Sequence, residues 1–332
     1  MQDANGLAPG LMIIHGNRLE TLRELAVDWM RAHPLAPLEN EVILVQSNGI
    51  AQWLQMALAA DPAQGGCGIA AALDVQLPAR FLWDSYRGVL GRDSVPEQSP
   101  LDKQPLTWRL MRLLPALQDQ PDFAPLKRFL ADDHDCRKRY QLAVRLADLF
   151  DQYQVYRADW LNDWAAGRDH IGLARTGARP LDDEERWQPA LWRAVLADVG
   201  AERLSDSRAG IHPRFVQHLL DCDSRPASLP RRVIVFGISS LSAQTLEALA
   251  VIGRFSQVLL CVLNPCEYHW GDIVADQDLL LHEYRRQQRR PGTPLQLDEN
   301  TLHQHAHPLL AAWGKQGRDY INLLDQHDER AS

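Results

Sequence analysis

The first part of the chain alternates short apolar runs with segments of helical periodicity. Leu11–His15 is an apolar run closed by a turn, and residues 19–30 then place apolar side chains three and four positions apart. Glu41–Val45 is a second apolar run. It is broken at Ser47–Gly49, and another helical pattern begins at Ile50. This order of strand, helix, strand and helix predicts an α/β fold with a parallel sheet.

The middle of the chain, from about residue 78 to about residue 220, is predicted to be almost wholly helical. Prolines and charged clusters separate five segments of helical periodicity, which are Arg80–Leu90, Pro105–Leu117, Arg137–Tyr156, Glu184–Val199 and Pro213–Leu220. The block has the character of a large helical insertion or a second domain.

Strand signals return after this block. Arg232–Gly237 and Val258–Leu263 flank a helical pattern at Leu241–Ile252, and the three have the size of one βαβ unit. We expect the first and last strand pairs to share one sheet. Leu309–Leu324 predicts a last amphipathic helix. The pattern divides the chain into residues 1–77, 78–225 and 226–332.

Composition agrees with a folded protein. The chain has 332 residues, of which 45% are hydrophobic and 23% are charged, enough to bury a sizeable core. No secretory signal and no apolar run long enough to span a bilayer is visible, which predicts a cytoplasmic protein without membrane contact. The five cysteines are odd in number and scattered, and Cys266 with His269 is one C-x-x-H pair without a second. Neither a disulfide framework nor a metal site is expected.

The formal net charge is −8, which disfavours a self-standing DNA-binding domain but leaves room for a local basic groove. The most basic segment, Tyr284–Arg290, is typical of a solvated helix end; contact with nucleic acid stays open.

A nucleotide site is expected at the strand ends of a parallel sheet. The segment His15–Glu20, after the first strand, lacks the G-x-x-x-x-G-K-[ST] pattern that cradles phosphates. The later strand ends in Phe236–Ser240 without an acid for magnesium, and the same residues lack a G-x-S-x-G nucleophile turn. We therefore expect no catalysis by this chain. The Asp132–Asp135 cluster has the composition of a cation site, but its place before a long helix is more typical of a cap.

The long helix predicted at Arg137–Tyr156 has two faces. Its apolar stripe is Leu142, Leu146, Leu149 or Phe150, and Tyr153. Asp148, Asp151 and Gln152 stand at i, i+3 and i+4 and share a polar face. That face is either solvated or reads bases, because a carboxylate accepts a hydrogen bond from cytosine and glutamine pairs with adenine.

Short stretches in order along most of the chain resemble the RecC family, the gamma subunits of the bacterial exonuclease V (RecBCD) complex. They include Gly16–Leu19, Ile43–Gln55, Gly68–Ala70, Leu77–Ala79 with Phe81 and Trp83, Ala147–Tyr153 with Val155–Arg157, Asp159–Leu161, Trp187–Gln188 with Leu191–Trp192, Phe236–Ser239, Asn264–Cys266 with Trp270–Ile273, and Pro308–Leu310 with Trp313–Lys315 and Gly317–Tyr320.

The resemblance implies a superfamily 1 helicase-like fold that has lost its ATP-binding motifs. Residues 1–77 and 226–332 would form a 1A-like domain, and residues 78–225 a 1B-like insertion. The family works with RecB-like and RecD-like subunits, which use the ATP and Mg²⁺, and this chain would need no cofactor. It handles duplex-end and single-stranded DNA and scans the 3′-ended strand for the recombination hotspot Chi.

The resemblance also implies a set of Chi-reading positions: Gln46, Asn48, Gln52, Leu77, Trp83, Asp148, Leu149, Asp151, Gln152, Arg157 and Arg208. Glutamine and arginine suit base edges, and tryptophan can stack on an unpaired base. Trp83 can equally be core, and Arg157 can pair with Asp159. Asn48 departs from the family, where threonine is expected, so the hotspot sequence can differ.

Length is a second departure, because RecC proteins are much longer, so we expect a fragment or a truncated form. Two other functions stay open. One is a scaffold that binds only partner subunits, for which substitution of Gln46, Trp83 and Asp148 would leave DNA processing unchanged. The other is a subunit with cryptic nuclease activity, which would be lost on substitution of His134 or Asp135.

Overall fold

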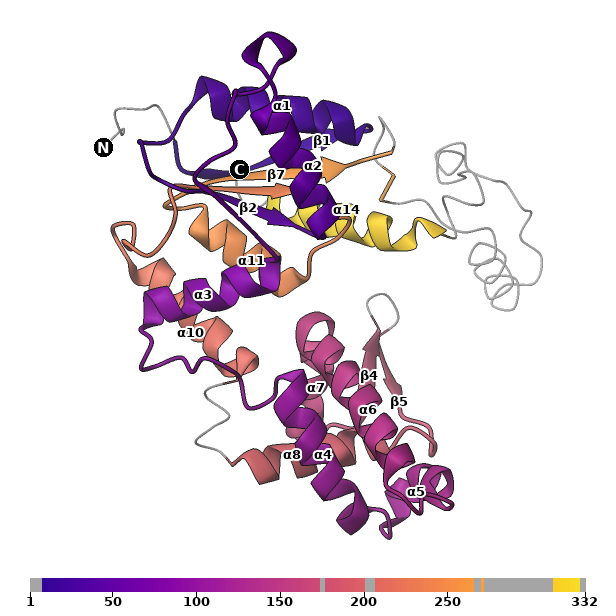
Figure 1. Cartoon of the computed structure of the whole chain (residues 1–332). Coiled ribbons are helices and arrows are strands. Elements are labelled where there is room, and N and C mark those ends of the chain that lie inside the picture. The colour runs from indigo at the N-terminus through magenta and orange to yellow at the C-terminus, as the bar shows by residue number, and fades with distance from the viewer. Residues whose placement is uncertain (1–7, 174–176, 201–206, 266–269, 272–312, 329–332) are drawn as a thin grey trace, which may run out of the picture. The chain divides into compact units, whose positions relative to one another are not determined.

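A computed structural model describes residues 8–173, 177–200, 207–265, 270–271 and 313–328 (Figure 1). They form two compact units. The sheet unit comprises the described residues up to Phe81 and from Pro230 onward, and the helical unit comprises those from Leu82 to Leu229. The helicase-domain assignments made for residues 1–77, 78–225 and 226–332 stay a prediction. No helix among the described residues has the length and apolar character needed to cross a membrane.

The sheet unit is built on one parallel sheet, which confirms the predicted α/β fold. Its strands lie in the order β1-β7-β6-β2-β3 and are all parallel. Their bounds are β1 Gly10–Gly16, β2 Glu41–Val45, β3 Leu73–Gln76, β6 Arg232–Phe236 and β7 Gln257–Leu263. The sheet thus joins strands from both ends of the chain, and the helical unit is inserted between β3 and β6.

Helices cover both faces of this sheet (Figure 1). Their bounds are α1 Leu19–Ala32, α2 Asn48–Ala59, α11 Ala243–Ile252 and α14 Lys315–Asp328. Leu22 of α1 and Leu54 of α2 pack with Ile43 and Ile234 of the central strands in one core. β6 is buried along its whole length, which explains why its residues after Arg232 form a continuous apolar run rather than an alternating pattern.

A buried ion pair closes the amino end of the sheet. The side chain of Arg232 is fully buried and donates to both carboxylate oxygens of Glu41 on β2, through Nε at 2.9 Å and through its Nη2. Its Nη1 donates to the carbonyl oxygen of His33, just after α1, at 2.8 Å. One guanidinium therefore joins β6, β2 and α1.

The helical unit contains α3, which begins in the sheet unit, followed by six further described helices. Their bounds are α3 Pro78–Leu90, α4 Lys103–Leu117, α5 Ala124–Leu130, α6 Arg137–Tyr156, α7 Ala158–Ala165, α8 Trp187–Val199 and α10 Arg208–Asp221. The block expected to be almost wholly helical also contains one pair of short strands. The strands β4 (His170–Leu173) and β5 (Gly177–Pro180) form a small antiparallel sheet.

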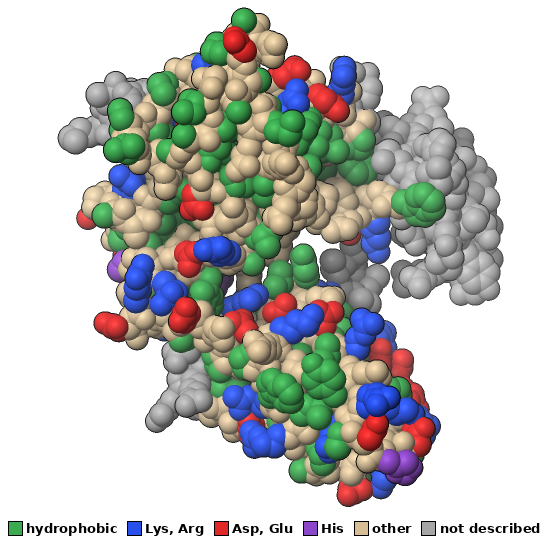
Figure 2. Space-filling view, viewed as in Figure 1, with side chains coloured by type: hydrophobic (Ala, Val, Ile, Leu, Met, Phe, Trp, Pro, Cys, Tyr) green, Lys and Arg blue, Asp and Glu red, His purple; other side chains and the backbone are tan. Residues whose placement is uncertain are grey.

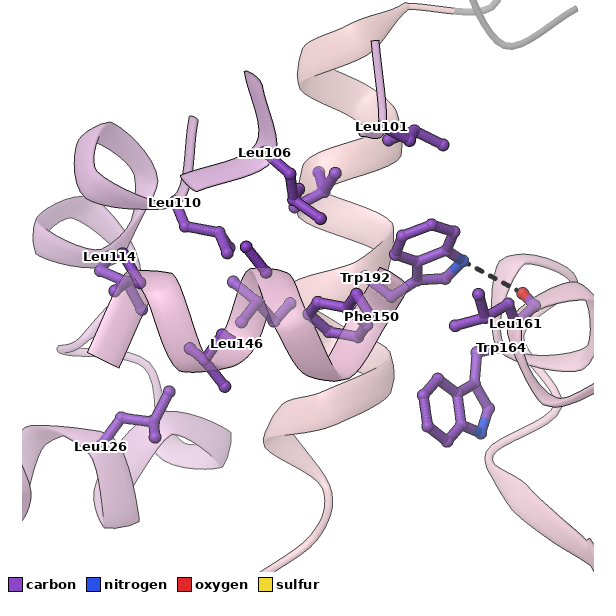
Figure 3. Close-up of a cluster of buried hydrophobic side chains, with 14 of the residues drawn as sticks. Leu101, Leu106, Leu110, Leu114, Leu126, Leu146, Phe150, Leu161, Trp164 and Trp192 are labelled. Carbon is purple, nitrogen blue, oxygen red and sulfur yellow. Dashed lines mark hydrogen bonds between the residues drawn. The ribbon is translucent and has the colours of Figure 1, made fainter. Parts of the chain in front are cut away.

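The core of the helical unit lies where α4, α6, α7 and α8 meet (Figure 3). Phe150 of α6 is fully buried, with its ring centroid 5.3 Å from that of Trp192 on α8. The indole N–H of Trp192 donates to the carbonyl oxygen of Leu161 at 3.2 Å, so the largest apolar side chains are buried without stranding a polar group.

Most predicted helices have different bounds in the structure. Helices α3 and α4 begin two residues before their predicted starts, and α11 begins two residues after. The helix expected from Pro213 begins at Arg208, because Ser207 is the N-cap and its Oγ accepts from the amide of Gly210. The helix expected from Glu184 begins at Trp187. Of the helix expected at Leu309–Leu324, residues 309–312 lie outside the described residues, and α14 runs from Lys315 to Asp328.

Candidate nucleic-acid interface

The first group of predicted site residues lies where strands of the sheet unit end. Because β2 and β6 are parallel neighbours, Gln46 and the loop after Phe236 leave the sheet at the same edge. The side-chain oxygen of Gln46 accepts from the amide and the hydroxyl of Ser239, both at 3.4 Å. Gly237 permits this approach, with φ of +65° and no room for a Cβ, which would lie 2.9 Å from Ile50.

The other three residues of this group lie around the same edge. Asn48 opens α2 after the cap Ser47, and Gln52 follows one turn later, so both exposed amides share a face of the helix. The β2–β3 register pairs Leu44 with Gln76, which brings Leu77 to this edge with 53% of its surface exposed. The edge offers amide groups and one apolar side chain to a ligand.

The polar face of α6 is held by a lysine of α4. Lys103 Nζ lies 2.5 Å from Asp148 Oδ1, and Gln152 donates to Asp148 Oδ2 at 3.3 Å. The hydrogen bond and charge of Lys103 lower the pKa of Asp148 from its ordinary value. The predicted face therefore exists, but its first carboxylate is neutralised by a cation from another helix.

Asp151, one turn further along α6, meets Arg208 at the start of α10. The guanidinium lies 3.7 Å from Asp151 and 3.1 Å from Asp102. Burial raises the pKa of Asp151, and the charge of Arg208 opposes that rise. The structure thus brings together Asp148, Asp151, Gln152 and Arg208 with two residues that sequence reasoning missed, Asp102 and Lys103. We call these six residues the polar cluster.

Arg157 is engaged within its own surroundings. It donates to both oxygens of Asp159, at 3.0 and 2.7 Å, and to the carbonyl oxygen of Gly172 at 2.5 Å. Its guanidinium also stacks 3.8 Å from the ring centroid of Trp160. These contacts fix the junction of α6 and α7, so Arg157 meets a base only by giving up some of them.

The remaining two predicted residues have partly buried side chains. The indole N–H of Trp83 on α3 lies 3.2 Å from the carbonyl oxygen of Pro96 and 3.0 Å from that of Glu97, and its ring meets Tyr86 edge-on. Leu149 is half-buried, whereas its neighbour Phe150 fills the core. The Trp83 ring, held by these contacts, can stack on a base through the face that they leave open.

The Asp132–Asp135 cluster caps α6. Asp133 accepts from the amides of Lys138 and Arg139, at 3.0 and 3.2 Å, and Asp135 accepts from the amide of Arg137 at 3.1 Å. Within the described ranges, no group of three or more His, Cys, Asp or Glu side chains could hold a metal ion. The pair Cys266 and His269 and the basic segment Tyr284–Arg290 lie outside the described residues.

Fold and site together define a class of protein: a parallel α/β domain with a large helical insertion, whose first strand leads into Gly16–Leu19 rather than a phosphate-binding loop. The sequence profile described as RecC, N-terminal domain, matches residues 11–332. The chain belongs to this family.

Individual relatives agree. The RecBCD enzyme subunit RecC of Escherichia coli (strain K12) is 41% identical over 95% of this chain, and the protein of the same name from Haemophilus influenzae is 34% identical over 96%. The one from Mycolicibacterium smegmatis is 27% identical over 96%. The chain spans only 28%, 30% and 26% of the lengths of these three relatives.

Proposed function

We propose that this chain is the helicase-like, non-catalytic part of a RecC-type subunit. It channels unwound DNA and recognises the Chi hotspot on the 3′-ended single strand, in the repair of double-strand breaks by homologous recombination. It acts in the cytoplasm beside RecB-like and RecD-like subunits, which supply ATP hydrolysis with Mg²⁺. The family match over residues 11–332 is the observation that carries this proposal.

The sheet unit supports the helicase-like part of the proposal. Its five described strands are parallel, and its strand ends gather at one edge, where an active helicase of this type would bind nucleotide. Here that edge carries Gln46, Asn48 and Ser239, which offer hydrogen bonds suited to base edges. We propose a superfamily 1-like topology in which the sheet unit is the 1A-like domain and the helical unit the 1B-like insertion.

The polar cluster supports the recognition part. Asp148, Asp151 and Gln152 come from one helix, while Lys103 and Arg208 come from two others. The three carboxylates of the cluster face two cations, so the cluster has a formal charge of −1. A cluster with this charge does not attract phosphates, and its sequence preference must come from hydrogen bonds to bases. We propose that it reads bases rather than holding the backbone.

The test uses the full-length subunit reassembled with its RecB-like and RecD-like partners. Asp148→Ala should leave unwinding of DNA without a hotspot unchanged and lower the frequency of hotspot recognition roughly tenfold or more, as expected for one good base contact. Both quantities are measured on DNA with and without the cognate hotspot.

Asp221→Ala is the matched control. Asp221 is an exposed aspartate of the same unit and accepts from Gln217, four residues earlier, at 3.0 Å, which resembles the Asp148–Gln152 pair. The control should leave both quantities unchanged. If Asp148→Ala also changes neither, the polar cluster is a solvated surface and the scaffold function replaces recognition.

A further inference from the structure

Two aromatic side chains outside the polar cluster meet on the surface of the helical unit. Trp108 of α4 is 60% exposed and Tyr140 of α6 is 45% exposed. Their ring centroids lie 5.9 Å apart, with the planes tilted by 41°. Single exposed aromatics are common on protein surfaces, but a pair from two helices makes a continuous apolar platform. We call it the aromatic pair.

The aromatic pair continues the surface that carries the polar cluster. Lys103 contacts Asp148, and Trp108 contacts Tyr140, so α4 and α6 run antiparallel and share one exposed seam. Tyr140 and Asp148 are eight residues apart on α6, a rise of about 12 Å. At about 3.4 Å for each stacked nucleotide, that distance corresponds to three or four nucleotides.

The charge of the two helices differs from that of the chain. Together α4 and α6 hold seven basic residues and two acidic ones, a formal charge of +5 in a chain of net charge −8. Most of these basic residues have an ion-pair partner. Arg145 on α6 is exposed, and its charge acts on Asp148, three residues later on the same helix. Figure 2 shows hydrophobic side chains over α4 and α6 with Lys and Arg side chains beside them.

Proteins that bind single-stranded DNA combine aromatic rings with basic side chains. Every base has a π-face that stacks on an aromatic ring whatever its sequence, while basic residues contact the phosphates. The polar cluster offers hydrogen bonds but no exposed ring. The seam therefore has two neighbouring parts. The polar cluster can recognise bases through hydrogen bonds, and the aromatic pair can bind bases of any sequence by stacking.

We propose that Trp108 and Tyr140 form a stacking platform for the single strand, three or four nucleotides from the bases that meet Asp148, with Arg145 contacting the phosphate backbone. This rests on the proposed function, which supplies the strand. The platform holds the strand while successive bases contact the polar cluster.

The experiment scans 5-iodouracil, one position at a time, through the 3′-ended strand of forked DNA bound to the reassembled full-length complex, and maps light-induced crosslinks to this subunit. Trp108→Ala with Tyr140→Ala should lower crosslinking by roughly tenfold or more at the nucleotides that stack on the pair, three or four nucleotides from those that meet Asp148. Trp108→Phe with Tyr140→Phe should restore it, because the rings remain. Trp313→Ala, at an 82% exposed tryptophan of the sheet unit, should change nothing.

Two outcomes overturn the platform. The first is an unchanged crosslink map for the double alanine variant, even where Asp148→Ala abolishes hotspot recognition. The second is an intact map with weaker assembly of the complex, which makes the aromatic pair a protein-docking face. A failure of the proposed function can be told apart from a failure of the platform. In the first case Asp148→Ala leaves hotspot recognition unchanged, whereas the platform is tested separately by the crosslink map of the aromatic variants.

Discussion

The sheet unit and the helical unit differ in how deeply they bury the ion pairs Arg232–Glu41 and Lys103–Asp148. In the sheet unit, the Arg232 side chain is fully buried and bound to Glu41, of which 13% is exposed. In the polar cluster of the helical unit, Lys103 and Asp148 are 50% and 38% exposed. An unpaired buried charge costs several kcal/mol, whereas an exposed ion pair contributes about 0–1 kcal/mol.

This difference separates charges that serve folding from charges that can serve binding. Arg232 cannot leave Glu41 without destabilising three elements of the sheet unit. Lys103 and Asp148 can separate at little cost, so either can exchange its partner for a phosphate or a base. The comparison can be tested by removing one member of each kind of pair.

The largest effect is expected for Arg232→Ala in the full-length subunit. It leaves the Glu41 carboxylate largely buried without its cation, and the free energy of unfolding should fall by about 3–5 kcal/mol. Urea denaturation followed by circular dichroism measures the loss. Arg128→Ala, which removes an exposed pair with Glu184, is the control and should cost about 0–1 kcal/mol. An equal loss of unfolding free energy for the two variants would show that burial does not distinguish the two pairs.

A smaller effect is expected at a largely buried acid of the helical unit. Asp198 is 14% exposed and contacts both Arg109 and Arg112. Asp198→Ala leaves the Arg109 guanidinium, itself 16% exposed, without its acceptor, and should cost about 1–3 kcal/mol. Asp198→Asn keeps an acceptor and should recover part of that loss. A cost as large as that of Arg232→Ala would show that this unit also depends on buried charge.

The smallest effects, and of opposite sign, are expected for the two carboxylates of α6. Lys103 lowers the pKa of Asp148, so its ionised form stabilises the folded state above the ordinary pKa of 3.8. That contribution is lost as the pH falls through the lowered folded value. Burial raises the pKa of Asp151 despite Arg208, so its ionisation at neutral pH disfavours the folded state.

Asp148→Asn should therefore lower the urea midpoint slightly at pH 7, and Asp151→Asn should raise it slightly. The difference in urea midpoint between each variant and the parent protein should become smaller as the pH falls. It should do so first for Asp151→Asn, because Asp151 has the raised pKa and protonates at the higher pH. Midpoints measured from pH 7 down to pH 3 test the signs. A lowered midpoint for both variants would mean that the charge of Arg208 outweighs the burial of Asp151.

Elements with a continuous apolar run or a long helical period were predictable because these patterns are local. The structure has β2 at Glu41–Val45 and α6 at Arg137–Tyr156, with the bounds that the sequence pattern predicted. Elements without such a pattern were missed. β3 at Leu73–Gln76 alternates apolar and polar residues over only four positions, and the eight residues of α7 at Ala158–Ala165 are fewer than the window over which a helical period is recognised.

The site was predictable where its residues share one helix, and not where its contacts are tertiary. Asp148, Asp151 and Gln152 share a face of α6 because of helical spacing alone. Their partners Lys103 and Arg208 are 45 and 57 positions from Asp148 and Asp151, and no local pattern links such distant residues. The capping role expected of the Asp132–Asp135 segment followed from its place before a long helix, and its side chains accept from amides of α6.

The insertion of one unit within the other has a consequence for how the chain is synthesised. β2 ends at Val45 and its neighbour β6 begins at Arg232, so the ribosome must add the intervening residues before the central strands can pair. At about 5–20 residues per second, this takes roughly 10 to 40 seconds. The helical unit is continuous in sequence and can fold during that interval. Until then β1 lacks its neighbour β7 and β2 can pair only with β3, so these strands expose apolar side chains and unpaired backbone groups that favour aggregation.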